Sequence, residues 1–232
     1  MKEKILAQLK RIVADSYEAT AEHFAETRNK VPAPDFLWAV GKLRADDFVL
    51  DVGCGSGRLL GVLPIDTSRY LGIDQSAALL AIARREHVDY RFIAGDLTLA
   101  ETWPENKYLA VFCSAVINHI PGRTERIKVL RSMLSATKTG GRLIISYWKL
   151  EGKYRNKIWS MRLKRLFGLY AYGWNELVFP WKNNRGDKVA LRYYHLFTRN
   201  GFKREIREAG WNIKEEYDSR YNYWLVAEKE KE

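Results

Sequence analysis

The sequence predicts an α/β, Rossmann-like fold with a mostly parallel seven-stranded sheet, a C-terminal antiparallel hairpin and an N-terminal helical cap. Three observations lead to this expectation. Short β-rich runs alternate with helical runs from about Asp47 onward, which is typical of a parallel sheet wound with helices. A glycine-rich loop follows the first of these runs. Two further β-rich runs, separated by a short turn, lie near the C-terminus.

The first part of the chain, residues 1–45, is expected to form helices. They break around the segment KVPAPD, where Pro32 and Pro34 end one helix and start the next. Charged and apolar residues alternate at helical spacing at the amino terminus, unlike a secretory signal, and no run of about eighteen apolar residues occurs. We therefore expect a cytoplasmic protein that does not enter a membrane.

Five β-rich runs, separated by helical runs, are expected to form the parallel part of the sheet: FVLDVGC, RYLGID, YRFIAGD, YLAVFCSA and GRLIISYW. The segment TRNGFKREIREAG is expected to form a helix that Gly210 closes. After it, WNIKEEY and YNYWLVAE are expected to pair as antiparallel strands around a turn at residues 218–220. The region from Glu176 to Asp187 has the least regular pattern.

Positive charge is concentrated in one part of the sequence. The formal net charge is +11, and residues 151–207 hold fourteen Lys and Arg against four Asp and Glu, a surplus of ten. Aromatic residues interleave with this charge from Lys153 to Trp174, which is the composition of a surface that binds a polyanion such as RNA. Alternatively, the stretch is an amphipathic helix that covers the sheet. In that case its apolar residues face inward, namely Trp159, Leu163, Leu166 and Phe167.

The two cysteines, Cys54 and Cys113, lie inside glycine-rich or apolar motifs and lack the CxxC spacing of redox and zinc sites. We therefore expect free, reduced thiols and no disulfide framework. We also expect no metal site.

A ligand-binding loop is predicted in the segment VLDVGCGSG, where the first strand meets the first helix of the sheet. Its glycines, Gly53, Gly55 and Gly57, permit a tight turn and a close approach of a ligand to the backbone. The spacing is G-x-G-x-G, with Asp51 two residues before the first glycine, instead of the G-x-G-x-x-G that holds a dinucleotide pyrophosphate. An acid at this position favours a cationic ligand.

Two more acids follow the next two strands. Asp74 comes seventeen residues after Gly57, where a carboxylate can accept both hydroxyls of an adenosine ribose, and Asp96 is expected near the adenine. Each acid alone could be a helix cap or a turn residue. With the glycine loop they resemble the class I S-adenosylmethionine-dependent methyltransferases, from about residue 15 to 228. The resemblance implies a set of cofactor-binding residues: Asp51, Gly53, Gly55, Asp74, Asp96 and Leu97.

Four other segments resemble a narrower group, the tRNA wobble-uridine carboxymethyl methyltransferases. They are YEATAEHFAETR, AVINHIPGRTERIKVLR, YWKLEG, and the group FPW, RYYHLF and YNYW. The sequence departs from that group at Asn118, where its members usually have a second histidine, and in a short, basic region after YWKLEG. The resemblance implies S-adenosylmethionine as methyl donor, S-adenosylhomocysteine as product, tRNA as partner and the option of a small zinc-ribbon activator subunit.

The resemblance also assigns a domain organisation and a reaction. A single methyltransferase domain would span 1–232, with a helical cap (1–45), a cofactor-binding core (46–150), a basic aromatic insertion (151–190) and C-terminal substrate-side strands and helix (191–232). The implied reaction is esterification of the carboxylate of a carboxymethyl-type wobble uridine in tRNA. Two alternatives stay open: a small-molecule O- or N-methyltransferase acting on an acidic metabolite, and a non-catalytic tRNA-binding protein.

Candidate catalytic residues are those able to hold a carboxylate nucleophile, which needs alignment and desolvation but no general base. A guanidinium can grip a carboxylate at two points, so Arg28 and Arg192 are candidates for contact with the substrate carboxylate or a phosphate. His119 is expected beside the methyl-donor end of the cofactor, where it would position the base or the carboxylate. Arg28 could instead only pack the amino-terminal helix on the glycine loop, and His119 could be a helix-start residue.

The segment RYYHLF, residues 192–197, is too polar to bury without hydrogen-bond partners, so we expect it at a surface or a cavity mouth. If it is extended, Arg192 and Tyr194 share one face, which we favour for substrate, and Tyr193 and His195 share the other. Trp148 and Tyr193 are candidates for stacking on the uracil, and Trp148 could instead belong to the core. The predicted contacts with the base or the RNA are Trp148, Tyr193, His195, Arg162, Lys164 and Arg165.

Overall fold

The computed structural model describes residues 2–28, 33–62, 65–104, 106–149, 155–182 and 186–230, without the side chains of Arg28 and Arg155. The strands are β1 (Val49–Val52), β2 (Tyr70–Asp74), β3 (Phe92–Ala94), β4 (Tyr108–Cys113), β5 (Thr137–Trp148), β6 (Glu176–Lys182), β7 (Lys188–His195), β8 (Asn212–Asp218) and β9 (Asn222–Glu228). The helices are α1 (Glu3–Arg28), α2 (Pro34–Val40), α3 (Ala77–Glu86), α4 (Arg123–Ala136), α5 (Arg155–Leu166) and α6 (Arg199–Glu208), with short 3₁₀ helices η1 (Thr67–Arg69), η2 (Ala100–Thr102) and η3 (Ile117–His119).

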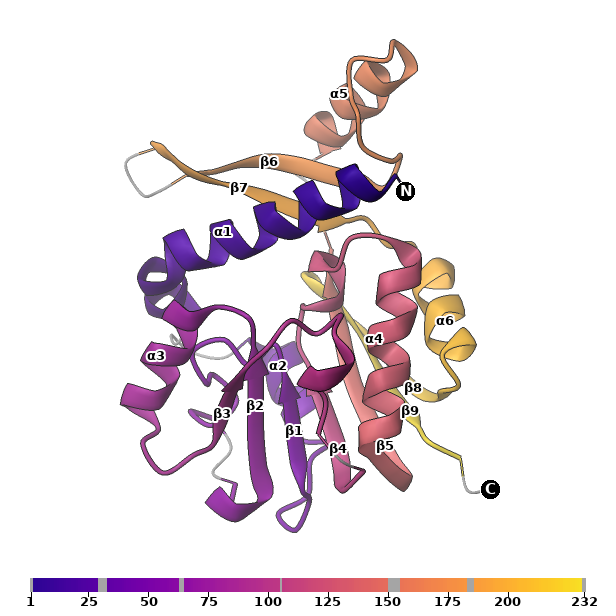
Figure 1. The fold of residues 1–232 in the computed structure, drawn as a ribbon. Helices are drawn as coiled ribbons and strands as arrows, with labels where there is room; N and C mark the ends of the chain where they lie inside the picture. The colour runs from indigo at the N-terminus through magenta and orange to yellow at the C-terminus, as the bar shows by residue number, and fades with distance from the viewer. Residues whose placement is uncertain are drawn as a thin grey trace.

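Seven of these strands form one sheet, in the order β3-β2-β1-β4-β5-β9-β8 (Figure 1). β1 pairs in parallel with β2 and β4, and β5 continues this parallel part. β9 pairs antiparallel with β5 and β8, so the C-terminal hairpin joins the edge of the parallel sheet. The predicted fold class is therefore confirmed.

Helices cover both faces of the sheet, which explains why all four residues of β1 are buried. Leu50 and Val52 pack with apolar residues of α4 and α6. Val49 faces the other way and packs with residues of α2 and α3. The remaining residue of the strand, Asp51, is a carboxylic acid, and an acid in this apolar layer points to a function rather than to packing.

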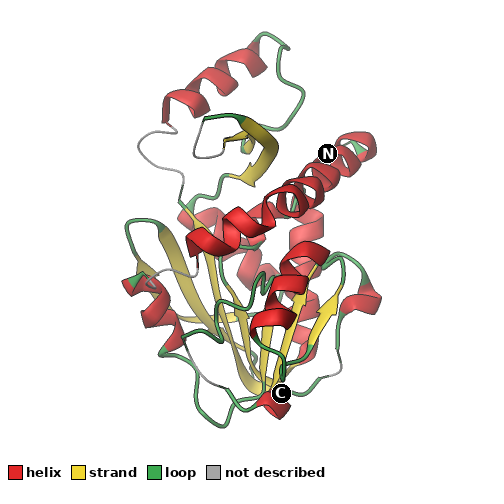
Figure 2. Cartoon of the chain, turned by 90° about the vertical axis from the view of Figure 1, so that its left-hand side faces the viewer, coloured by secondary structure: helices red, strands yellow, loops and turns green. Residues whose placement is uncertain are grey.

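α1 lies above the ends of the parallel strands (Figures 1 and 2), whereas α2 packs on one face of the sheet. α2 starts at Pro34, as the sequence predicts, because proline fits the first turn of a helix. α1 runs across the sheet and contacts both α3 and β7. No helix in the described part of the chain is both long enough and apolar enough to cross a membrane.

β6 and β7 form a separate antiparallel hairpin beside α1 (Figure 1), in which Phe179 lies opposite Arg192. The expectation that residues 176–187 are the least regular part of the chain is therefore wrong for residues 176–182, which form β6, while residues 183–185 lie outside the described residues. Leu177, Phe179 and Trp181 alternate along β6 and are buried, as in a strand with one packed face. The exposed Pro180 between them hides this alternation in the sequence.

α5 projects away from the seven-stranded sheet (Figure 1), so it does not cover that sheet as the alternative interpretation of this stretch required. Trp159 is 66% exposed and Phe167 is 71% exposed. Ile158 and Met161 form the inner side of the helix and pack against the β6–β7 hairpin. The helix therefore rests on the hairpin and presents a second apolar stripe to solvent.

Candidate cofactor and substrate site

A cavity of about 450 Å³ is bounded by the loops that follow β1 to β4, by α1 and by β7. The carboxyl ends of parallel strands are where doubly wound folds bind ligands, and the volume falls in the range of about 300–1,000 Å³ that is usual for small-molecule sites. Six residues that were expected to bind a cofactor line this cavity together: Asp51, Gly53, Gly55, Asp74, Asp96 and Leu97.

The glycine loop adopts a backbone conformation that side chains disfavour. Gly53 and Gly55 have φ angles of 70° and 56°, in the left-handed region. A Cβ on Gly53 would lie 2.3 Å from Cγ2 of Val116, which also lines the cavity. The N–H of Gly53 donates to the carbonyl of Ile73 at 2.7 Å and ties the loop to β2. The loop therefore presents bare backbone to a ligand.

Asp51 is 4% exposed, and its carboxylate accepts a hydrogen bond from the Tyr70 hydroxyl at 2.9 Å. Burial raises the pKa of Asp51 to about 7; the Tyr70 hydrogen bond opposes this rise and the charge of Asp74 adds to it. A cation placed beside this carboxyl would favour its ionised form. The first acid of the motif is therefore an electrostatic partner for positive charge.

Asp74 holds the glycine loop and the start of α3 together. Its Oδ2 accepts from the N–H of Gly55 and its Oδ1 accepts from the N–H of Ser76, both at 2.9 Å. Burial raises the pKa of Asp74 despite these backbone hydrogen bonds. Each carboxylate oxygen has two acceptor positions, so Asp74 can still accept hydroxyl groups of a ligand.

Asp96 and Leu97 border the cavity after β3. Oδ1 of Asp96 accepts from both the N–H and the hydroxyl of Thr98 at 2.8 Å. Lys10 of α1 donates from Nζ to the Thr98 hydroxyl at 2.8 Å and to Glu125 of α4 at 3.0 Å. These contacts fasten α1 across the cavity.

His119 lines the cavity from η3 and contacts two other elements. Its Nε2 lies 2.8 Å from the Tyr17 hydroxyl, and its Nδ1 lies 3.0 Å from the main-chain oxygen of Tyr193. The ring centre is 4.5 Å from that of Tyr194. In the loop before η3, Ala115 has a φ of 57°, which stores backbone strain at the cavity wall.

Arg192 and Tyr194 line the cavity from β7, and Trp148 lines it from β5. The guanidinium carbon of Arg192 lies 3.1 Å from the centre of the Trp181 ring, and its buried Nε has no hydrogen-bond partner among the described residues. The ring of Trp148 lies 5.1 Å from that of Tyr194. A stacked cation with spare donor capacity beside aromatic rings suits an anionic group on a planar molecule.

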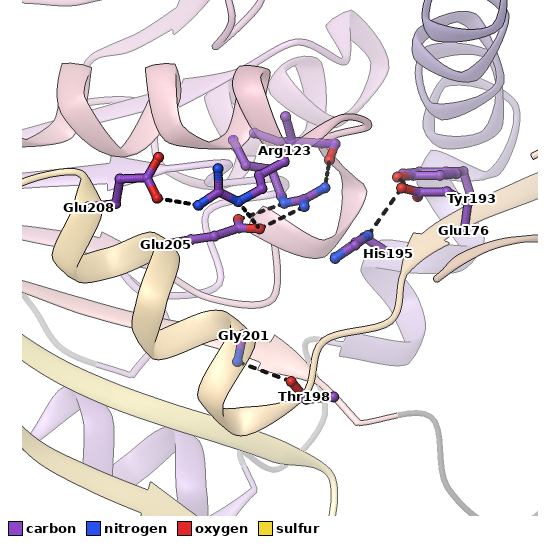
Figure 3. Close-up of polar contacts among 10 residues, drawn as sticks. Arg123, Glu176, Tyr193, His195, Thr198, Gly201, Glu205 and Glu208 are labelled. Carbon is purple, nitrogen blue, oxygen red and sulfur yellow. Dashed lines mark hydrogen bonds and ion pairs between the residues drawn. The ribbon is translucent and has the colours of Figure 1, made fainter. Parts of the chain in front are cut away.

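Tyr193 and His195 point to the other face of β7, as the alternation in RYYHLF predicts. Tyr193 is 1% exposed and its hydroxyl donates to Glu176, which also contacts Nδ1 of His195 at 3.2 Å (Figure 3). Neither residue lines the cavity. Tyr194, and not Tyr193, therefore presents its ring to the cavity.

The three basic residues that were expected to contact RNA lie on α5, away from the cavity. Arg162 and Arg165 line a small recess against β6, and Arg165 donates to the carbonyl of Tyr172. Lys164 is exposed. Arg28 is the last residue of α1, and its side chain lies outside the described residues.

Asp35 of α2 lines the same cavity, although sequence analysis gave it no role. Its Oδ2 accepts from the side chains of Asn222 at 2.6 Å, Ser219 at 3.0 Å and Trp224 at 3.2 Å. Burial alone would raise the pKa of Asp35, but these three hydrogen bonds outweigh it and lower the pKa. Asp35 thus joins α2 to the C-terminal hairpin as an ionised group.

The part of α1 that faces the cavity was also missed by sequence analysis. Lys10, Tyr17 and Phe24 all line the cavity and are seven residues apart. Seven residues correspond to about two helical turns, so this spacing places all three on one face. The pattern was available in the sequence, but it does not reveal what the face covers.

Residues 49–141 match a protein family described as a methyltransferase domain. The chain is 26% identical over 231 residues to the tRNA (carboxymethyluridine(34)-5-O)-methyltransferase of Schizosaccharomyces pombe, with 92% of this chain and 94% of that protein covered. It is 25% identical over 265 residues to the protein of the same description from Saccharomyces cerevisiae, with 92% and 94% covered.

Solved structures resemble the fold over nearly its full length. The complex of DhpI with SAM and HEP aligns with a TM-score of 0.66 at 19% identity, covering 98% of this chain and 99% of that one. A chain from the complex between the Haloferax volcanii Trm112 methyltransferase activator and a methyltransferase aligns with a TM-score of 0.64 at 15% identity, covering 95% and 98%. These likenesses concern the fold. The region that matches the methyltransferase family, residues 49–141, contains the three acids that line the cavity, Asp51, Asp74 and Asp96, so the chain resembles S-adenosylmethionine-dependent methyltransferases in fold and in this site.

Proposed function

We propose that this protein transfers a methyl group from S-adenosylmethionine to the carboxylate of a carboxymethyl-type wobble uridine in tRNA, in the cytoplasm. The observation that carries the proposal is one cavity lined both by acids at the ends of β1 and β2 and by an arginine of β7 among aromatic rings. We call the part that holds Asp51 and Asp74 the acidic end, and the part that holds Arg192, Tyr194 and Trp148 the arginine end. The acidic end suits a cationic cofactor, and the arginine end suits a carboxylate attached to a planar base.

The residues at the acidic end fit the proposed cofactor. Asp51 would face the positively charged methionyl part, and Asp74 would accept the ribose hydroxyls next to Gly55. Leu97, which is buried, would lie against the adenine, with Asp96 at its edge. When bound, S-adenosylmethionine supplies an electrophilic methyl group on a sulfonium.

The arginine end fits a nucleophile that is already ionised. A carboxylate carries its charge at neutral pH, so methyl transfer to it needs orientation and loss of water, and no proton has to be removed. Arg192 would hold the carboxylate through two parallel N–H donors, with its own position fixed against Trp181. Tyr194 and Trp148 would stack on the uracil. Arg28 remains a candidate for a second cation.

RNA would contact the hairpin and α5. Residues 155–175 contain five Lys and Arg and no Asp or Glu. Trp159 of α5, Phe167 just after the helix and Lys164 are all exposed. Unpaired bases of an RNA loop stack on such rings while cations meet the phosphates. The inner side of α5 shares an apolar cluster with Tyr194 and Trp148, so the helix is connected to the arginine end of the cavity through this cluster.

A small activator subunit is the second proposed partner, because a chain of similar fold occurs in a complex with the Trm112 activator. Co-purification with such a subunit, followed by a comparison of cofactor affinity with and without it, tests this partner. Equal affinity and equal tRNA methylation by the isolated chain would remove the activator from the proposal.

The decisive experiment is a methylation assay on bulk tRNA from a strain that lacks this gene. Labelled S-adenosylmethionine is supplied, and the nucleosides are then separated by digestion and mass spectrometry. Label in a base-labile methyl ester of a carboxymethyl-type uridine supports the proposal. Label in a base-stable nucleoside would support a tRNA methyltransferase but would contradict the formation of a methyl ester.

The same assay separates the proposal from its main rival, a small-molecule methyltransferase that acts on an acidic metabolite. No label in tRNA, with S-adenosylhomocysteine binding intact and the activator present, favours the rival. Salt gives an independent check, since contacts to six or more phosphates lower tRNA affinity by about 10³-fold or more between 50 and 200 mM salt. A flat salt response contradicts an RNA substrate.

A further inference from the structure

His119 connects two elements that cover the cavity. Its Nε2 lies 2.8 Å from the hydroxyl of Tyr17 in α1, and its Nδ1 lies 3.0 Å from the main-chain oxygen of Tyr193 in β7. His119 itself belongs to η3, directly after the β4 loop, and lines the cavity. One imidazole therefore joins the core of the fold to α1 and to the β6–β7 hairpin.

The partners of His119 define the tautomer of its neutral ring. A main-chain carbonyl only accepts hydrogen bonds, so Nδ1 carries the hydrogen. In the neutral ring Nε2 is then an acceptor, and the Tyr17 hydroxyl donates to it. Both nitrogens are thus engaged within the protein. In this arrangement neither nitrogen is left to take a proton from a substrate, and a carboxylate nucleophile has no proton to give.

Tyr17 also lies at the centre of an aromatic cluster that includes the support of Arg192. Its ring packs edge-on against His119 at 5.3 Å, Phe24 at 5.4 Å and Trp181 at 6.1 Å between ring centres. Trp181 carries the guanidinium of Arg192 on its face. A displacement of α1 would therefore disturb the cation at the substrate end of the cavity.

β7 is held from its opposite face as well. The hydroxyl of Tyr193 donates to Glu176 of β6, which is 9% exposed (Figure 3). Tyr193 is thus fixed at its carbonyl by His119 and at its hydroxyl by Glu176. Its neighbours in the strand, Arg192 and Tyr194, point the other way and line the cavity, so their direction depends on how Tyr193 is held.

We infer that His119 is a positioning residue and not a general base, and that Tyr17 is its partner in holding α1 and the hairpin closed over the cofactor. The inference deepens and rests on the proposed function, in which a carboxylate nucleophile needs no base. α1 borders the cavity through Lys10, Tyr17 and Phe24, so its movement controls how a ligand enters and leaves. The hydrogen bond between Tyr17 and His119 is one of the links that have to break for α1 to move, together with those of Lys10 to Thr98 and Glu125.

Two single variants and their combination test the link. Tyr17→Phe removes the hydroxyl and keeps the ring, and His119→Asn keeps an N–H donor near the position of Nδ1 while removing Nε2. In each we expect S-adenosylhomocysteine to dissociate roughly two- to tenfold faster in stopped-flow fluorescence, the effect of losing one hydrogen bond. The double variant should match the faster single variant, because both remove the same bond. Tyr217→Phe on the exposed β8 is the matched control and should behave as wild type.

The pH dependence of tRNA methylation separates positioning from base catalysis. We expect His119→Asn to retain turnover, with a raised KM for tRNA and a pH profile of kcat/KM shaped like that of the wild type. If His119 were a general base, His119→Asn would have no turnover, or its pH profile of kcat/KM would lack the fall at low pH that the wild type shows. Either of these results overturns the inference, as does wild-type cofactor release in both single variants.

The release measurements need no methyl acceptor, so they stand apart from the proposed reaction. Faster release in both variants, from an enzyme that labels no tRNA, supports the link and rejects the substrate. Unchanged release, from an enzyme that forms the methyl ester in tRNA, rejects the link and keeps the substrate. The two proposals therefore fail by different results.

Discussion

Acidification should weaken cofactor binding through one buried carboxyl, that of Asp51. Burial raises the pKa of this group to about 7 in the ligand-free protein. S-adenosylhomocysteine carries a cationic amino group, and a positive charge near Asp51 favours the ionised carboxylate. Protonation of Asp51 therefore competes with binding of the cofactor.

The size of the effect follows from the pKa. If the carboxyl has to be ionised in the complex, the observed dissociation constant is the intrinsic one multiplied by a factor. The factor is one plus the ratio of protonated to ionised carboxyl in the ligand-free protein. For a pKa of about 7 this factor is about 30 at pH 5.5 and about 1.3 at pH 7.5, so affinity should rise roughly 25-fold over this interval. At pH 6 about nine-tenths of a proton should leave per ligand bound. Isothermal calorimetry in two buffers with different ionisation enthalpies measures both quantities.

Asp51→Asn is the variant that isolates this group, since it keeps the shape and removes the titration. It should bind S-adenosylhomocysteine more weakly than the wild type at pH 7.5, with a much flatter pH dependence. Some slope of the same sign should remain, because burial also raises the pKa of Asp74. The reasoning is refuted if wild-type affinity is flat from pH 5.5 to 7.5, or if the Asn variant keeps the full slope.

The same carboxyl affects the stability of the ligand-free protein with the opposite sign. Its pKa of about 7 in the folded state lies above the ordinary value of 3.8, so the folded state binds this proton more tightly than the unfolded state. The resulting stabilisation is fully present below pH 3.8 and is lost as the pH rises through 7, by at most about 4 kcal/mol. Thermal melts at pH 5 and 7.5 should show that the wild type loses more stability over this interval than Asp51→Asn.

Three further predictions concern the loop, an ion pair and α5. Gly53→Ala should weaken cofactor binding in calorimetry, because its Cβ would lie 2.3 Å from a valine side chain. Gly168→Ala is the control for backbone strain in the same calorimetry and in thermal melts, since Gly168 has a similar φ of 69° and no atom within 4 Å among the described residues. Arg126→Met breaks a buried two-point ion pair with Glu205 of α6 and should cost about 3–5 kcal/mol in denaturant unfolding. Arg123→Met removes a 44% exposed ion pair with Glu208 (Figure 3) and should cost about 1 kcal/mol or less. Trp159→Ala should lower tRNA affinity about tenfold without changing how steeply that affinity falls with salt concentration, because stacking releases no counterions. An unchanged affinity in filter binding would contradict a stacking role.

The sheet was predictable because its strands carry a local signal. Each β-rich run is separated from the next by a helical run, and parallel pairing with crossover helices follows from that alternation. The clustering of Asp51, Asp74 and Asp96 follows too, since the carboxyl ends of parallel strands meet at one edge of a sheet. Spacing along the chain was enough in both cases, because every strand–helix unit has the same geometry, so the position of a residue in the unit determines its place in the sheet.

The insertion could not be predicted in the same way, because its burial depends on partners far away in the sequence. α5 has apolar residues on two sides, and only the hairpin decides that Ile158 faces inward and Trp159 outward. The alternation in RYYHLF separated the two faces correctly. It did not show that Glu176 would bury Tyr193, nor that Tyr194 would line the cavity in its place. Those outcomes depend on β6, whose strand pattern Pro180 hides.

The two ends of the cavity differ in how firmly they are built, and this difference predicts an order of binding. Asp74 is held by backbone N–H groups of the loops that follow β1 and β2, so the acidic end is formed before any ligand arrives. The direction of Arg192 depends instead on Trp181, on Tyr17 and therefore on the position of α1. A cofactor that draws α1 closed should also fix the arginine end, so S-adenosylhomocysteine should raise tRNA affinity. By reciprocity tRNA should raise S-adenosylhomocysteine affinity by the same factor. Tyr17→Phe should reduce both effects equally. A fluorescence titration of each ligand in the presence of the other measures them. If the two affinities are independent of each other in the wild type, the proposed order of binding is wrong.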